Sequence, residues 1–254
     1  MVELGYALSS EEFPPEKLVS YAQAAESTAF KFALISDHFH PWINDQGNSP
    51  FVWSVIGAIS QVAGQLSLGT GVTCPLMRIS PAIVAQAAAT STVMMPGRFF
   101  LGLGTGENLN EHITGLHWPP ASQRLEMLEE AVAVIRLLWQ GGWQSHYWKY
   151  YTVEQARIFT LPEEPPPIMI AAGKNRSAEL AGRIGDGMIS TAPERDLIKQ
   201  FEQAGGKGKP RYGQVTICYA PSDDEAARTV RKCWPNAGLS APLTTAMPWC
   251  CQAG

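Results

Sequence analysis

The sequence predicts an α/β fold of parallel strands joined by helices, and within that class a (β/α)8 barrel. Short apolar, β-branched runs alternate with longer helical segments, which is the pattern of parallel strands with helical crossovers. Polar, glycine-rich loops follow the second, fourth, fifth and sixth runs, as at the C-terminal face of a barrel. A doubly wound sheet also fits the alternation, but it concentrates its functional loops at one switch point.

Seven apolar runs are expected to be strands, so the barrel is predicted to be incomplete. They are Leu4–Leu8, Phe32–Ser36, Leu66–Val72, Phe99–Gly104, Ile168–Ala172, Gly187–Thr191 and Val215–Tyr219. A closed barrel has eight strand–helix units in about 250 residues or more, and no eighth unit is recognisable here. The tail 235–254 has no helical or strand period, and we interpret it as a truncated or replaced end.

The helices between the strands carry recognisable start and stop signals. The segments "PPEKLVSYAQAAEST" and "PAIVAQAAATSTVMM" begin with proline, which fits the first turn of a helix. In "QRLEMLEEAVAVIRLLW" apolar residues recur every three or four positions, and "RSAELAGRIG" ends on a glycine typical of a helix C-cap. These signals predict a single barrel domain over 1–234.

One insertion interrupts the alternation of strands and helices. Residues 140–166 are rich in aromatic side chains and end in a run of prolines. Such a segment predicts a short hairpin over one barrel end, followed by a proline linker. The aromatic cluster is expected to pack the hairpin, with a stacking platform as the alternative.

The bulk composition narrows the possible partners. The chain has 254 residues, a net charge of −4 and no basic run, so nucleic acid is not an expected partner. It has no stretch of about 18 apolar residues and no basic segment followed by an apolar core, so we expect neither a membrane span nor a signal peptide. The five cysteines have no CxxC spacing. A cytoplasmic protein with reduced thiols is therefore predicted.

The stretch "ISDHFHPW", which follows the second apolar run, has three interpretations. The pair His38 and His40 resembles the ligands of metal-dependent hydrolases, but the later strand ends "AAGKN" and "STAPE" offer no further histidine, so no metal is predicted. As a second interpretation, Asp37 caps a helix and His38 is an ordinary polar residue. The third interpretation is acid/base chemistry, because a histidine with a pKa of about 6.5 can accept a proton at neutral pH. Trp42 would add a flat apolar wall.

The loop "GLGTGENLNE" at 102–111 brings a carboxyl group and an amide to a strand end. It is not a dinucleotide fingerprint, because Glu107 stands at the third glycine position. Glycines let the backbone approach a ligand closely, so Glu107 and Asn110 predict a site for a flat heterocycle with one proton donor. The alternative is a tight turn without a ligand.

Two further strand ends carry candidate ligand contacts. In "GTGVTCP" small residues allow close backbone contact, while Cys74 is either a contact residue or a packed thiol. In "AAGKN" the start of the next helix offers N–H groups to an anion near Gly173, and Lys174 adds charge. An ordinary turn is the alternative for this second loop.

Together these loops resemble the coenzyme F420-dependent oxidoreductases of the luciferase-like superfamily, in the branch related to glucose-6-phosphate dehydrogenase. The resemblance runs in order from about residue 4 to residue 236 and is carried by "LISDHFHPW", "LGTGVTCP", "FFLGLGTGENLNE" and "IAAG…AELAGRIGDG". It implies a (β/α)8 barrel of the luciferase-like type, commonly a homodimer. It also implies that the deazaflavin F420 binds at the C-terminal ends of the strands.

The resemblance also implies roles for individual residues. His38 would remove the hydroxyl proton of an alcohol substrate as hydride leaves carbon, and Trp42 would stabilise the reacting state. Glu107 would serve as proton donor or partner toward the deazaflavin ring. The Gly71–Val72 peptide would buttress that ring as a strained bond and a candidate for the cis form. The implied cofactor contacts are Asp37, Gly71, Val72, Cys74, Asn110, Gly173 and Lys174, and the implied substrate-side residues are Glu11 and Thr191.

This sequence departs from the family pattern in ways that affect the expected substrate. Cys74 replaces a threonine, and Glu194 stands where a lysine would hold a sugar phosphate. Since a carboxylate repels a phosphate, the sequence predicts an alcohol that is uncharged or differently charged. The alternatives are an FMN-dependent luciferase-like monooxygenase and an inactive truncated fragment.

Overall fold

The main sheet is parallel and curled. The computed structural model describes residues 2–28, 30–191 and 194–235. Within them the strand order is β1-β2-β3-β4-β7-β8-β9, with β1 (Gly5–Leu8), β2 (Phe32–Ile35), β3 (Ser67–Thr70), β4 (Phe99–Leu103), β7 (Ile168–Ala171), β8 (Gly187–Ser190) and β9 (Arg211–Gly213). The ring of Phe32 on β2 contacts Tyr212 on β9 with a centroid distance of 5.0 Å, although four strands separate them in the sheet. The sheet therefore bends round into a partial barrel, which confirms the predicted β/α barrel architecture with seven strands.

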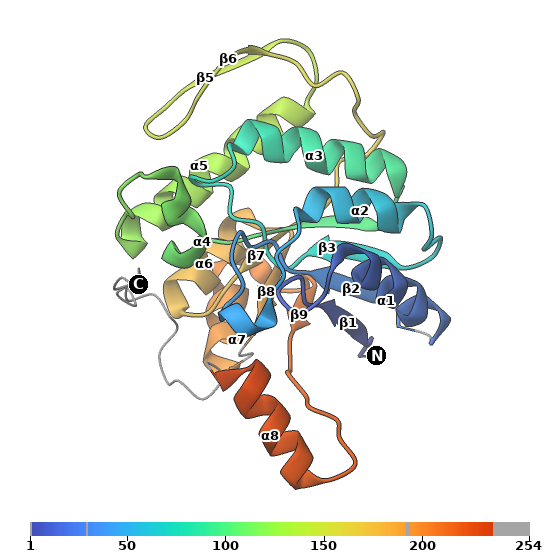
Figure 1. Cartoon of the computed structure of the whole chain (residues 1–254). Helices are drawn as coiled ribbons and strands as arrows, with labels where there is room; N and C mark the ends of the chain where they lie inside the picture. Colours follow the sequence, from blue (N-terminus) through green and yellow to red (C-terminus); the bar gives the residue numbers. More distant parts are fainter. Residues whose placement is uncertain (1, 29, 192–193, 236–254) are drawn as a thin grey trace.

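Helices follow the strands and cover the outer face of the sheet (Figure 1). They are α1 (Pro15–Ser27), α2 (Val52–Ser60), α3 (Pro81–Met94), α4 (Asn108–Glu111), α5 (Ala121–Trp139), α6 (Asn175–Ile184), α7 (Arg195–Phe201) and α8 (Asp223–Cys233), with short turns of helix at η1 (Asn44–Gln46), η2 (His112–Thr114) and η3 (Glu202–Gly206). Proline occupies the first positions of α1 and α3, as the sequence predicted. No helix among the described residues has the length and apolar character needed to cross a membrane.

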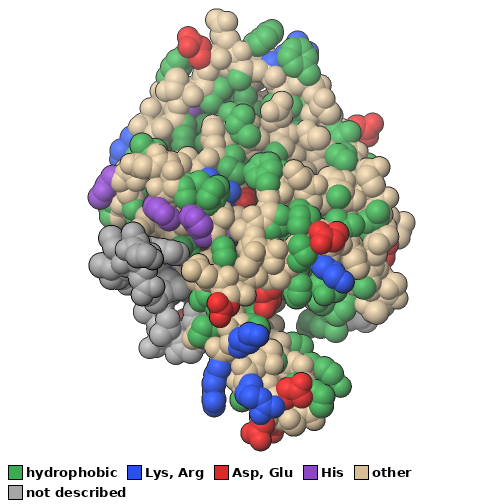
Figure 2. Space-filling model, in the orientation of Figure 1, with side chains coloured by type: hydrophobic (Ala, Val, Ile, Leu, Met, Phe, Trp, Pro, Cys, Tyr) green, Lys and Arg blue, Asp and Glu red, His purple; other side chains and the backbone are tan. Residues whose placement is uncertain are grey.

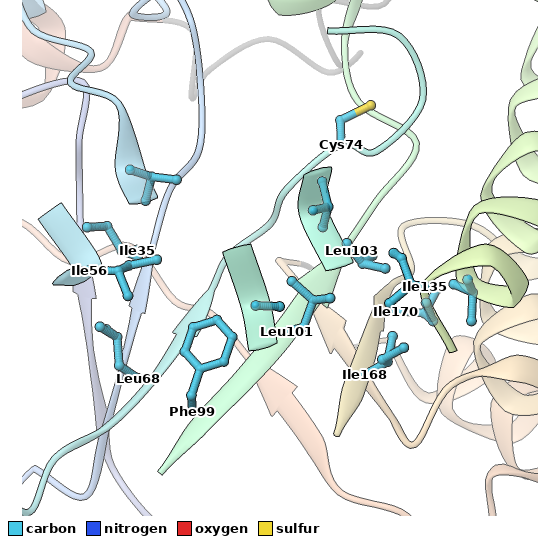
Figure 3. Packing of buried hydrophobic residues seen from close by; sticks show 14 of the residues in the cluster. Ile35, Ile56, Leu68, Cys74, Phe99, Leu101, Leu103, Ile135, Ile168 and Ile170 are labelled. Atoms are coloured by element: carbon cyan, nitrogen blue, oxygen red, sulfur yellow. The ribbon is translucent and has the colours of Figure 1, made fainter. Parts of the chain in front are cut away.

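Side chains of the sheet alternate between two apolar clusters, because successive residues of a strand point to opposite faces. The outward side chains meet the helices, as Figure 3 shows for Leu101 and Leu103 of β4 beside Ile168 and Ile170 of β7 and Ile135 of α5. The inward side chains form a smaller group inside the curl, the lumen cluster, made of Leu34, Phe100, Met169 and Ile189. Both faces of the sheet are thus apolar, and the polar residues gather at the strand ends.

The insertion forms a hairpin, as predicted, but it does not lie over an end of the barrel. Strands β5 (Gln144–Tyr147) and β6 (Thr152–Ala156) pair antiparallel and lie on the outer side of α5 (Figure 1). Glu130 of α5 explains this position, because its buried carboxylate accepts hydrogen bonds from the backbone N–H groups of Tyr150 and Tyr151. Its Oε1 also lies 3.3 Å from Nε2 of His146.

The seventh strand was predicted at the wrong position. The sequence alternates Val215, Ile217 and Tyr219, which is typical of a strand, but β9 is at Arg211–Gly213 and these three side chains are 78%, 83% and 96% exposed. The register with β8 pairs Met188 to Ser190 with 211–213. Since no further described strand lies beyond β9, the alternating residues have no partner to bury them. The predicted irregular tail, apart from residue 235, falls outside the described residues.

Candidate active site

A histidine–glutamate pair lies at the ends of β1 and β2. The Nδ1–H of His38 donates to Oε1 of Glu11, and both side chains are largely buried. Glu11 is further held by the hydroxyl groups of Ser9 and Ser36, each of which donates to Oε2 at 2.9 Å. Because a carboxylate accepts at Nδ1, the other ring nitrogen of His38 is left with its lone pair. His38 therefore presents Nε2 as a base.

The two groups of this pair shift each other's pKa in opposite directions. Burial alone lowers the pKa of His38, but the hydrogen bond to Glu11 and the charges of Glu11, Glu107 and Asp37 raise it above its ordinary value. Burial alone raises the pKa of Glu11, whereas the hydrogen bond and charge of His38 lower it below its ordinary value. The pair is thus held with an ionised carboxylate over a wide pH range.

Glu107 and Trp42 lie on the open side of His38. Oε2 of Glu107 is 3.9 Å from Nε2 of His38, and the Glu107 side chain is one third exposed. The Trp42 indole meets the His38 ring edge-to-face, with centroids 4.9 Å apart. The structure therefore brings together the three side chains that were assigned to catalysis, from the loops after β2 and β4.

Behind this group a buried ionic network joins the loops after β2, β3 and β4. Asp37 accepts from Thr73 Oγ1 at 2.7 Å and from Arg78 Nη2 at 2.9 Å. Arg78 also donates through its backbone N–H to Glu111 at 2.8 Å. Burial raises the pKa of Glu111, and the bonds from Arg78 offset only part of this effect. Both carboxylate oxygens of Asp37 are therefore bonded within the protein. Its predicted contact with a cofactor stays a prediction.

Asn110 fixes the loop that follows β2 and retains one donor without a described partner. Its Oδ1 accepts from the backbone N–H groups of Phe39 and His40, at 2.9 and 3.0 Å. Asn110 is 2% exposed, and its Nδ2 has no partner among the described residues. A buried donor without a partner is costly, so a ligand acceptor at this point would satisfy it.

The Gly71–Val72 peptide is cis, as was expected for the end of β3. Val72 packs against the lumen cluster, so this peptide lies between the cluster and the rim of polar residues. The unpaired amide donor of Asn110 and the flat indole of Trp42 fit a planar heterocycle with carbonyl oxygens.

The remaining predicted residues lie outside the group around His38. The thiol of Cys74 is 4% exposed and packs in the outer core, beyond Leu103 in Figure 3. Gly173 and Lys174 are exposed, and their N–H groups donate to Ser177 Oγ at 3.2 and 3.1 Å. Thr191 is exposed at the end of β8. Their predicted roles as ligand contacts stay predictions.

Several residues of this site were not found from the sequence. Ser36, Arg78 and Glu111 bind the carboxylates and loops around His38, but each is an ordinary polar residue in a loop or short helix. An arginine between apolar residues in "PLMRIS" is the one signal that could have indicated a buried ion pair. The carboxylate of Glu11 is 2% exposed and faces His38, and its predicted place on the substrate side stays a prediction.

The two histidines of "DHFHPW" bind different partners. His40 Nδ1 lies 3.0 Å from the carbonyl of Leu109, and its ring stacks on His112. Histidines gather on the face shown in Figure 2. The residues that the structure describes hold no group of three or more histidine, cysteine or acidic side chains arranged for a metal ion.

The chain belongs to the luciferase-like family. The model of the family described as luciferase-like monooxygenase matches residues 1–247. The fold and the rim of polar strand ends described above agree with that membership.

Among curated relatives, the F420-dependent hydroxymycolic acid dehydrogenase of Mycobacterium tuberculosis is 39% identical over 238 residues, covering 91% of this chain and 66% of that protein. The F420-dependent glucose-6-phosphate dehydrogenase of Segniliparus rotundus is 41% identical over 253 residues, covering 94% of this chain and 75% of that protein. The chain thus spans about two thirds to three quarters of these relatives' length. They confirm the predicted branch of the family.

A solved structure supports the same branch. The F420-dependent secondary alcohol dehydrogenase in complex with an F420-acetone adduct has a TM-score of 0.88 and 31% identity to this chain. The match covers 92% of this chain and 74% of that one.

Proposed function

We propose that this chain is an F420-dependent oxidoreductase that transfers a hydride between an alcohol carbon and the deazaflavin. The observation that carries the proposal is the position of His38, with Nδ1 on the buried Glu11 and Nε2 toward Glu107 and Trp42. The relatives reported above are named as F420-dependent dehydrogenases, which favours this function over the FMN-dependent monooxygenase.

In this function His38 accepts the hydroxyl proton of the substrate at Nε2. The charge of Glu11 stabilises the imidazolium that forms and holds the ring in one orientation through Nδ1. Trp42 excludes water from one side of the reacting carbon and offers one N–H donor. Glu107, one third exposed, would serve as a proton donor or partner toward the deazaflavin ring.

The residues present fit coenzyme F420. When bound, the deazaflavin supplies a two-electron hydride acceptor or donor. Asn110 would hold it through the unpaired Nδ2, and Gly71 and Val72 would support one side of its ring. At the start of α6, the charge of Lys174 would attract an anionic part of the cofactor, and Gly173 would let that part approach the backbone closely.

The substrate is proposed to be an alcohol without a phosphate group. Glu194 is exposed at the start of α7, close in sequence to the substrate-side residue Thr191. A carboxylate at this position disfavours a phosphorylated sugar by repulsion. The relatives include enzymes named for a hydroxymycolic acid and for a secondary alcohol as well as for glucose 6-phosphate, so the proposed class rests on Glu194.

The test is a titration of the purified chain with F420 and, separately, with FMN, followed by addition of alcohols. Saturable binding of F420 and bleaching of its absorbance by a secondary alcohol, with little bleaching by glucose 6-phosphate, is the expected result. Tight FMN binding with oxygen consumption would favour the monooxygenase. Absence of saturable binding to either cofactor would favour the inactive fragment.

We also propose that the protein is cytoplasmic, as its composition predicted, and that it forms a homodimer, as the family resemblance implied. The mass of the chain in solution, measured by light scattering against its 27.6 kDa monomer, tests the dimer. A monomeric mass at all concentrations would contradict the proposed homodimer.

A further inference from the structure

Gln46 connects the loop of Trp42 to the end of α8. Its Oε1 accepts from the backbone N–H of Trp42 at 2.9 Å, and its Nε2 donates to the carbonyl of Cys233 at 3.2 Å. The Gln46 side chain is buried, at 7% exposure. A single amide therefore satisfies one group of the catalytic loop and one group at the C-terminal end of a distant helix.

Trp234 makes a second connection at the same place. Its Nε1–H donates to Oε1 of Glu12 at 2.8 Å. Glu12 adjoins Glu11, the partner of His38. Asn48 bonds to the same loop: its backbone N–H donates to the Glu11 carbonyl at 3.0 Å, and its Nδ2 donates to the Glu12 carbonyl at 3.2 Å. We call Gln46, Asn48 and Trp234 together the junction. The loops of Glu11 and Trp42 and the end of α8 thus share one set of hydrogen bonds.

Helix α8 has few other attachments. None of its residues is buried, and it stands apart from the sheet at the end of a long connection (Figure 1). Charged side chains gather over this projecting part of the molecule (Figure 2). The contact with η1 at its C-terminal end is therefore a main point of attachment. A change there affects the helix and the catalytic loops together.

We propose that Gln46 and Trp234 are positioning residues, which fix Glu11, His38 and Trp42 by tying their loops to the end of α8. The consequence for turnover rests on the proposed function, whereas the coupling is a property of the chain without any ligand. A shift of about 1 Å in a catalytic group can cost about 100-fold in rate, so such a junction has a measurable effect on kcat.

Because the charges around His38 set its pKa, a shift of the Glu11 loop can be measured as a change in the pKa of His38. Glu11, Glu107 and Asp37 face His38, and Asp37 is paired with Arg78. Of the three carboxylates, Glu11 is the one whose loop is bound to the junction. Loosening that loop weakens the hydrogen bond at Nδ1, and the pKa of His38 then falls.

The experiment is an NMR titration of the His38 ring in the ligand-free chain. Trp234→Phe keeps an aromatic ring but removes the N–H donor, and Gln46→Leu removes the amide. Trp148→Phe, in the exposed part of the hairpin, is the matched control. We expect the His38 midpoint to move to lower pH in the first two variants and to stay in place in the control. In the loaded enzyme kcat should fall about 10- to 100-fold.

An unchanged His38 midpoint in both variants overturns the proposal, even if the melting temperature falls, because the junction would then serve stability alone. The two variants break different bonds, so a folding failure in one leaves the other as a test. If the midpoint moves but His38→Ala turns over at the wild-type rate, the junction stands and the proposed function fails.

Discussion

The two sides of the strand-end rim differ in how their polar groups are held. On the side of β1 to β4, Glu11, Asp37 and Glu111 are at most 3% exposed, and each is bonded to a residue of another loop. On the side of β7 and β8, Lys174 and Thr191 are exposed. Groups that act on a reaction are most effective when they are fixed before the substrate arrives. This difference favours the first side for the proposed chemistry and the second side for the proposed contacts with the more variable parts of a ligand.

The largest expected effect is on the first side. His38→Ala should lower kcat by about 10²–10⁴-fold, the usual cost of a lost general base, while the Kd for F420 changes little. Steady-state kinetics and a cofactor titration measure the two quantities. His117→Ala, an exposed loop histidine, is the control. Wild-type turnover in His38→Ala would place the chemistry elsewhere.

The buried network should show its importance in stability. Arg78→Met leaves Asp37 and Glu111 without their cation, and removing one partner of a buried ion pair costs about 3–5 kcal/mol. Arg183→Met breaks an ion pair with Glu129 that is more than 40% exposed on both sides, which costs at most about 1 kcal/mol. Urea unfolding of both variants gives the difference. Equal losses would mean that the loops of the first side are not held by this network.

The smallest effect is expected on the second side. Lys174→Ala should weaken F420 binding by up to about fivefold at low salt, because an exposed charge contributes at most about 1 kcal/mol. The loss should shrink in high salt, and kcat should stay unchanged. Titrations at two salt concentrations measure it, with Lys199→Ala as the control. A large loss of kcat would show that this side also takes part in the chemistry.

The sequence was sufficient to place His38 and Glu107 together, because both follow parallel strands whose carboxyl ends meet at one rim. It could not show that Glu11 serves His38, since that depends on a side-chain hydrogen bond between two loops. The ion pairs of Arg78 could not be predicted for the same reason. Such partners depend on the exact course of loops, which no periodic pattern describes.

The two errors in the predicted fold also arose from contacts between residues distant in sequence. The alternation Val215, Ile217, Tyr219 predicts a strand from local pattern alone, but pairing with β8 is satisfied by 211–213. A hairpin was predicted within the insertion 140–166, whereas its position on α5 depends on the hydrogen bonds of Glu130. In both cases a contact distant in sequence determined the outcome.

The central claim is that Glu11 tunes His38 as the base. His38 accepts a proton only when it is neutral, so the rate of hydride transfer should rise with pH through the pKa of His38. Because Glu11 raises that pKa, Glu11→Gln should move the rising limb to lower pH. It should also lower the plateau, by about 100-fold where the ring is displaced.

The decisive measurement is the pH dependence of single-turnover reduction of bound F420 by a saturating alcohol, in the wild type and in Glu11→Gln. The expected result is one rising limb in each, with the midpoint of the variant at the lower pH. A limb that stays at the same pH, or moves upward, would contradict the pairing of Glu11 with the catalytic base.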